Sequence, residues 1–179
     1  MSETRSRGVW VEVQLQRILS LSKQGKCTDA LDRAQHLGSE VPGLEFTKDG
    51  LEPLIKSGRT NYLLGTAYAS CGKSDQAQEK FKLAASATAT DQVRWAWLAA
   101  QKLPGFGQAK WQERLQTALN DAANRTETSA YPSWWMYTAG SLEIELGKPQ
   151  EAAARFQKAL LLPDRMLAYH FTRLAQAKQ

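Results

Sequence analysis

The stretch LLGTAYASCGKSDQAQEKFKLA, residues 63–84, decides the fold, because most of its pattern returns later in the chain. Its counterpart is YTAGSLEIELGKPQEAAARFQKA, residues 137–159. Five small or aromatic residues recur 75 positions later: Gly65 as Gly140, Gly72 as Gly147, Ala77 as Ala152, Phe81 as Phe156 and Ala84 as Ala159. A lysine follows the second glycine in both copies. Agreement at one fixed offset, without gaps, indicates an internal repeat.

Two weaker copies accompany this pair. Gly25 and Ala30 precede Gly72 and Ala77 by 47 positions, and Leu98 and Ala99 follow Leu64 and Gly65 by 34. The successive offsets are 47, 34 and 41, which is a period of 34 with insertions of 13, 0 and 7 residues. The sequence therefore predicts four repeats, at about residues 11–43, 58–90, 92–124 and 133–163, within a single domain of residues 1–179.

Each strong copy has the pattern of two helices. Residues 62–71 and 74–85 carry apolar side chains three and four positions apart, as amphipathic helices do. Gly72 and Lys73 between them predict a tight helix-ending turn, and Pro149 suits a first helical turn. Small residues such as Gly65 and Gly140 let paired helices approach closely. Five residues are candidate helix caps: Thr28, Ser74, Asp91, Ser133 and Asp164.

The period and these residues resemble the tetratricopeptide repeat (TPR). The second copy matches its pattern at five positions: Leu64, Gly65, Tyr68, Ala77 and Phe81. The last copy matches at Gly140, Ala152 and Phe156, but Glu143 replaces the expected tyrosine. The resemblance implies an all-α fold, a right-handed superhelical stack of antiparallel helix pairs. Residues 165–177 then form a C-terminal capping helix or the first half of a further repeat.

The insertions complete the prediction of the fold. Residues 43–58 are rich in glycine but also apolar, so we expect a packed loop with one short helical turn. Residues 124–132 predict a polar connection. Cys27 and Cys71 fit no metal-binding or redox spacing, and two cysteines are few for a disulfide framework. They are interpreted as reduced thiols that fill small apolar spaces.

Composition narrows the function. The net charge is +5, but the Lys and Arg residues are scattered among acids, which argues against nucleic acid as a partner. No apolar run approaches the roughly 20 residues of a membrane helix, and no secretory signal follows the polar start. We expect a cytoplasmic protein or a piece of a larger one, without a metal or cofactor. No residues have the spacing of a catalytic motif, so we expect no enzyme.

The resemblance implies that the first helices of the repeats line a concave groove for an extended peptide or a helix of a partner protein. Helical angles predict seven wall residues: Arg59, Tyr62, Thr66, Trp97, Trp134, Tyr137 and Ser141. Trp135 and Met136 point the other way and are expected to be largely buried. Four other hypotheses remain open: wall aromatics that pack on one another or on the insertion at 43–58, a homodimer contact, a structural segment that packs on other domains of a larger protein, and a basic helical array that binds RNA.

Overall fold

The structure is a computed structural model that describes residues 3–39, 43, 48–164 and 166–177. All regular elements within these residues are helices, which confirms the all-α prediction. The chain falls into two compact units. The first comprises Met1–Ala87 and Leu98–Phe106, and the second comprises Thr88–Trp97 and Gly107–Gln179.

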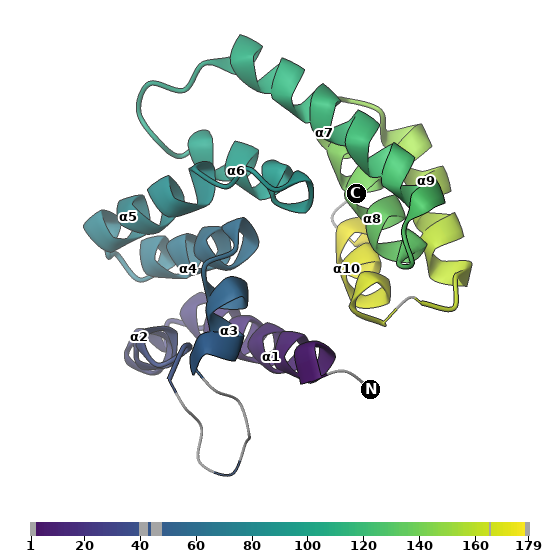
Figure 1. The fold of residues 1–179 in the computed structure, drawn as a ribbon. Coiled ribbons are helices and arrows are strands. Elements are labelled where there is room, and N and C mark those ends of the chain that lie inside the picture. The colour runs from purple at the N-terminus through teal and green to yellow at the C-terminus, as the bar shows by residue number, and fades with distance from the viewer. Residues whose placement is uncertain (1–2, 40–42, 44–47, 165, 178–179) are drawn as a thin grey trace. The chain divides into compact units, whose positions relative to one another are not determined.

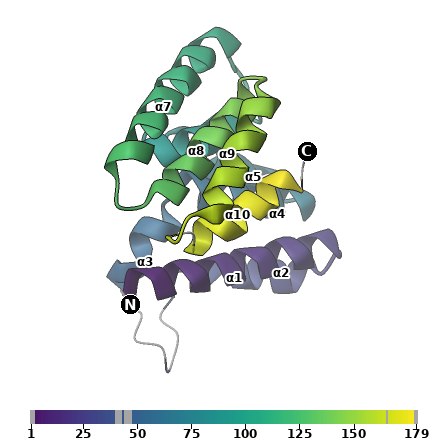
Figure 2. The same ribbon diagram turned by 90° about the vertical axis from the view of Figure 1, so that its right-hand side faces the viewer.

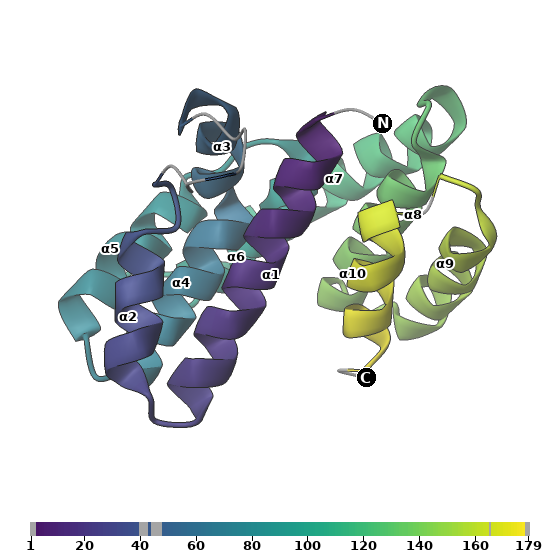
Figure 3. The ribbon, with the colours of Figure 1, turned by 90° about the horizontal axis from the view of Figure 1, so that it is seen from below.

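The first unit is built from five complete helices: α1 (Glu3–Lys23), α2 (Cys27–Gln35), α3 (Lys48–Ile55), α4 (Gly58–Ser70) and α5 (Ser74–Ala85). Helices α4 and α5 form an antiparallel pair, visible in Figure 1. Helices α1 and α2 form a second pair, joined by a tight turn (Figure 3). Helix α1 also packs on α4, so the two pairs share one core that contains the fully buried Leu15, Ile18 and Leu51.

The second unit begins with a 3-10 turn, η1 (Thr90–Gln92), and the first part of α6 (Val93–Ala100). The last three residues of α6 belong to the first unit. The longer helices follow: α7 (Gln108–Thr128), α8 (Pro132–Glu145), α9 (Pro149–Leu161) and α10 (Met166–Gln176). Helix α8 packs between α7 and α9, and α10 packs on both α8 and α9 (Figure 2).

The same backbone turn ends three helices, α1, α4 and α8, in three copies of the sequence repeat. Gly25, Gly72 and Gly147 have φ of 74°, 71° and 73°, values that favour glycine. The N–H of the lysine after each glycine donates to a carbonyl five residues earlier: Lys26 to Leu21 at 2.9 Å, Lys73 to Tyr68 at 2.9 Å and Lys148 to Glu143 at 2.8 Å. This bond and the positive φ are those of the Schellman motif. The predicted turn at Gly72–Lys73 is therefore confirmed.

The pairs α4–α5 and α8–α9 share the same close contact between a glycine of the first helix and a phenylalanine of the second. A Cβ atom on Gly65 of α4 would lie 2.7 Å from Cε1 of Phe81 on α5. A Cβ atom on Gly140 of α8 would lie 2.6 Å from Cε1 of Phe156 on α9. Real Cβ atoms essentially never approach so closely. The predicted role of these glycines in close helix packing is confirmed.

Helices α1 and α4, the first helices of the two pairs in the first unit, run parallel. Arg59, at the start of α4, bonds to Glu12 in α1. Cys71, just after the end of α4, bonds to Cys27, just after the end of α1. In the second unit the N–H of Ser133 at the start of α8 donates to Oδ2 of Asp164, just before α10, at 3.2 Å. The Arg59–Glu12 contact joins the start of α4 to the middle of α1, and the disulfide joins the ends of the two helices, so α4 runs in the direction of α1.

The structure corrects the predicted helix caps. Helix α2 begins at Cys27, α5 at Ser74 and α8 at Pro132, so Thr28, Ser74 and Ser133 all lie inside helices. The glycine turns enter the next helix directly, which leaves Lys26 and Lys73 at the cap positions without a side-chain bond. Asp91 lies within η1, whose cap position is Ala89, and its carboxylate accepts a hydrogen bond from the indole N–H of Trp134. Pro149 begins α9, as predicted.

Three longer-range predictions also change or gain detail. Residues 124–128 continue α7 instead of forming a polar connection, and the hydroxyls of Thr126 and Thr128 donate to carbonyls four residues earlier in that helix. The insertion at 43–58 contains the eight-residue helix α3, while residues 44–47 lie outside the described residues. Cys27 and Cys71 form a disulfide, so the prediction of two reduced thiols is wrong.

Candidate interaction surface

The predicted wall of the first unit is centred on an ion pair between helices. The guanidinium of Arg59 on α4 donates through both terminal nitrogens to the carboxylate of Glu12 on α1, with Nη2 3.1 Å from Oε1. Their side chains are only 11% and 7% exposed. Gln16 donates to the same carboxylate at 2.8 Å. The charge of Arg59 is thus neutralised within the protein, which leaves little attraction for a ligand carboxylate.

Tyr62 and Thr66 continue this face along α4 and are half-buried. The Tyr62 ring lies 5.9 Å from the ring of Phe81, and the Thr66 hydroxyl donates to the Tyr62 carbonyl at 3.0 Å. Both side chains therefore have fixed positions while part of their surface stays accessible. A rigid, partly exposed tyrosine is a common anchor in protein interfaces.

Two exposed valines on α1 extend the same region. Val9 is 45% exposed and Val13 is 47% exposed, and the spacing Val9, Val13, Gln16 places them along one stripe of the helix. Gln16 contacts Glu12, which connects the stripe to Arg59 and α4. Sequence reasoning missed the valines, although their position away from the core residues Leu15 and Ile18 could have revealed them.

Trp134 and Tyr137 lie in a core cluster of the second unit with Phe156 of α9 and Phe171 of α10. The Trp134 ring is 5.7 Å from Tyr137 and 5.6 Å from Phe171. Tyr137 is 6% exposed and Trp134 is half-buried. The Trp134 indole N–H donates to Asp91 at 3.3 Å. These two aromatics hold α8 to its neighbours.

Trp97 and Ser141 are buried as well, at 8% and 2% exposure. The Trp97 indole N–H donates to Glu145 at 3.3 Å, and Arg94 donates to the same carboxylate at 2.9 Å. The Trp97 ring lies 6.2 Å from that of Trp111. Of the seven predicted wall residues, Tyr62, Thr66 and Trp134 are half-buried, Arg59 is bound to Glu12, and Trp97, Tyr137 and Ser141 are buried.

Trp135 departs from its predicted burial. Both Trp135 and Met136 are half-buried, as is Trp134. The Trp135 indole donates to the Ser129 hydroxyl at 3.2 Å, and the Arg125 guanidinium lies 4.7 Å from the centre of its ring. The predicted difference in burial between the two tryptophans is not seen: Trp134 and Trp135 are both half-buried, and Trp134 packs against the core cluster.

Among the described residues, the surroundings move the pKa values of Tyr68, Arg114 and Asp121. Burial, and then the charge of Glu79, raise the pKa of Tyr68, which keeps this core phenol neutral. Burial lowers the pKa of Arg114. A hydrogen bond from Thr90, followed by one from Arg125, lowers the pKa of Asp121. Each shift follows from packing or pairing within one unit.

An open depression of about 500 Å³ lies between α1 and α2. Its lining combines apolar and charged residues: Trp10, Gln14, Leu21, Asp29, Asp32, Arg33, His36 and Leu37. Arg33 lies within 3.5 Å of Gln14, and His36 pairs with Asp32 at 3.3 Å. The lining thus combines acidic and basic side chains with apolar ones.

Among the described residues, no group of three or more His, Cys, Asp or Glu side chains is placed to hold a metal ion. Among these same residues, no helix is both long and apolar enough to cross a membrane. Comparison with protein-family models and with curated proteins gives no match for this chain. The candidate surface is therefore interpreted from its own geometry.

Proposed function

We propose that the chain is a noncatalytic protein-interaction module related to the tetratricopeptide repeats. In this proposal its helix pairs form a right-handed superhelical stack, in which α10 caps the array or begins a further repeat. The supporting observation is the repeated lock between Gly65 and Phe81 and between Gly140 and Phe156, 75 residues apart. The shared turn after α1, α4 and α8 and the parallel course of α1 and α4 also support it.

The face that best suits a partner lies on the first unit. It consists of Val9 and Val13 on α1 and of Tyr62 and Thr66 on α4, with the Glu12–Arg59 ion pair between the helices. Aliphatic, aromatic and hydroxyl groups without a free charge fit a segment with apolar or proline side chains and an extended backbone. A terminal carboxylate would gain little here, because Arg59 already binds Glu12.

A structural role is the second candidate. The burial of Trp97, Tyr137 and Ser141 favours it, since these residues stabilise the second unit and leave less of the predicted wall for a ligand. In that case the module packs on other domains of a larger protein or on a second copy of itself. A homodimer would show as a doubled mass in light scattering at micromolar concentration.

Peptides selected from a displayed random library on the full chain test the first candidate. We expect them to carry apolar or proline side chains and to lose at least tenfold in affinity, about 1.4 kcal/mol, with Val13→Asp. Leu83→Asp on α5 is the matched control, because Leu83 is an equally exposed aliphatic residue at 49% on a second helix. Tyr62→Phe tests whether the Tyr62 hydroxyl contributes to peptide affinity, because this change keeps the ring contact with Phe81.

Two results would overturn the interaction proposal. One is a library that yields no peptide with measurable binding to the folded chain. The other is equal binding by the wild type, Val13→Asp and Leu83→Asp, since the contact would then lie away from α1. Circular dichroism of each variant separates loss of binding from loss of folding.

A further inference from the structure

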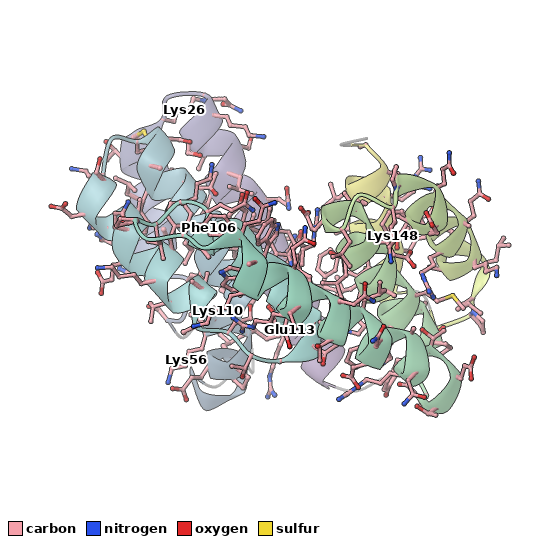
Figure 4. All side chains as sticks on the ribbon, turned by 90° about the horizontal axis from the view of Figure 1, so that it is seen from above. Lys26, Lys56, Phe106, Lys110, Glu113 and Lys148 are labelled. Carbon is pink, nitrogen blue, oxygen red and sulfur yellow. A yellow bond between two sulfur atoms is a disulfide. The ribbon has the colours of Figure 1, made fainter. Side chains whose placement is uncertain are left out.

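Cys27 and Cys71 are the chain's two cysteines, and the structure joins them across 44 positions of sequence. Their Cα atoms are 5.5 Å apart, within the usual range for a disulfide. Cys27 is the first residue of α2, and Cys71 follows the last residue of α4. Figure 4 shows the bond beside Lys26, at the turn between α1 and α2.

The bond joins the glycine turns of the two helix pairs, with Cys27 just after the first turn and Cys71 just before the second. Gly25 and Lys26 form the turn of the first helix pair, and Gly72 and Lys73 form the same turn in the second pair. The disulfide crosses from one turn to the next, so it fixes the spacing of the two pairs at that end. At the other end of α4, the buried Arg59–Glu12 ion pair provides the second tie to the first pair.

We propose that this disulfide is a permanent structural bond and that the protein folds and works in an oxidising compartment, not in the cytoplasm. Both cysteines are only half-buried, so packing alone does not shield the bond from reductants. Cytoplasmic glutathione and thioredoxin keep such accessible thiols reduced, whereas secretory and envelope compartments keep them paired. Both cysteines are consumed, so no free thiol remains to act as a reactive group.

The bond forms by ordinary thiol–disulfide exchange. The thiolate of one cysteine attacks the disulfide of an oxidised dithiol oxidoreductase, which gives a mixed disulfide and releases one thiolate of that enzyme. The second cysteine then attacks its partner's sulfur in the mixed disulfide. The enzyme leaves with two reduced thiols, having accepted two electrons, and two protons are transferred from the cysteine thiols. The half-exposed position of the pair makes both steps possible on a nearly folded chain.

The test measures the redox state of the full-length protein in the cells that make it. Cells are quenched with acid, free thiols are labelled with a maleimide of high mass, and the protein is separated by electrophoresis. We expect fewer than one chain in ten to be labelled. After reduction in denaturant, every chain should take two labels.

A matched variant shows whether the reagent reaches the site. Cys27→Ser leaves Cys71 without its partner, so this variant should take one label in the same quenched cells. Two labels on most wild-type chains in those cells would overturn the proposal, because the bond would then be absent at the site of function. Partial labelling that rises and falls with oxidant stress would also overturn it, since the bond would then be a reversible switch.

Discussion

Replacing Gly140 by alanine would place a methyl group 2.6 Å from Cε1 of Phe156 and 3.0 Å from Cδ1. Carbon atoms normally pack at about 3.5–4.0 Å, so the ring would have to move by about 1 Å. Phe156 is fully buried and lies in the core cluster with Tyr137 and Phe171, which leaves no open side for that movement. The helix pair α8–α9 must separate or the ring must leave its rotamer.

Two opposing terms set the size of the effect. Overpacking of a well-packed core costs about 1–3 kcal/mol, while alanine is favoured over glycine inside a helix by about 1 kcal/mol. Because the Phe156 ring is enclosed, we expect the overpacking cost to exceed the gain in helix propensity. Gly140→Ala should lower the free energy of unfolding by up to about 2 kcal/mol.

The assay is urea unfolding followed by far-ultraviolet circular dichroism, with hydrogen exchange of peptides from α8 and α9 to locate the loss. Ala154→Gly is the control: Ala154 is exposed on α9, so this change should cost about 1 kcal/mol through helix propensity alone. Combining Gly140→Ala with Phe156→Leu should be less harmful than the sum of the single changes, because the smaller side chain relieves the clash.

The reasoning is refuted if Gly140→Ala stabilises the protein by about as much as Ala154→Gly destabilises it. Propensity alone would then decide the outcome, and the close approach to Phe156 would have no energetic cost. Gly65→Ala offers an independent repetition in the first unit, since its added Cβ would lie 2.7 Å from Phe81.

Three further predictions concern buried and paired groups. Arg59→Met should lower the free energy of unfolding by about 3 kcal/mol because it leaves Glu12 buried without its charge partner, whereas Arg59→Met with Glu12→Leu should recover most of the loss in urea unfolding. Because the bond from Thr90 lowers the folded-state pKa of Asp121, this carboxylate stabilises the fold above its unfolded pKa, and the contribution disappears as pH falls through the folded pKa. Thr90→Val should raise the Asp121 pKa in an NMR titration, and an unchanged value would contradict the assigned cause. Trp134→Ala should lower the melting temperature by removing contacts in the core cluster; an unchanged melting temperature together with lost peptide binding would return this residue to the groove.

The candidate wall shows where reasoning from one sequence is weakest. Helical angles placed Trp97, Trp134 and Tyr137 on a shared face, but an angle says nothing about which other element covers that face. Helix α10 packs on α8, so Phe171 contacts both Trp134 and Tyr137. Trp97 meets Glu145 through a bond that spans 48 positions. Burial of these aromatics depends on contacts between distant segments, which the spacing of one helix does not record.

By itself, the sequence determined the helix pairs, the glycine turns after α1, α4 and α8, and the close approach of Gly65 and Gly140 to the following helices. These features depend on residues a few positions apart or on an ungapped repeat, so local geometry fixes them. Only the tertiary structure decided the Cys27–Cys71 bond, the Glu12–Arg59 ion pair and the contact of Asp164 with Ser133. Each joins residues more than 30 positions apart, and such pairings depend on how whole helices pack to bury their apolar faces.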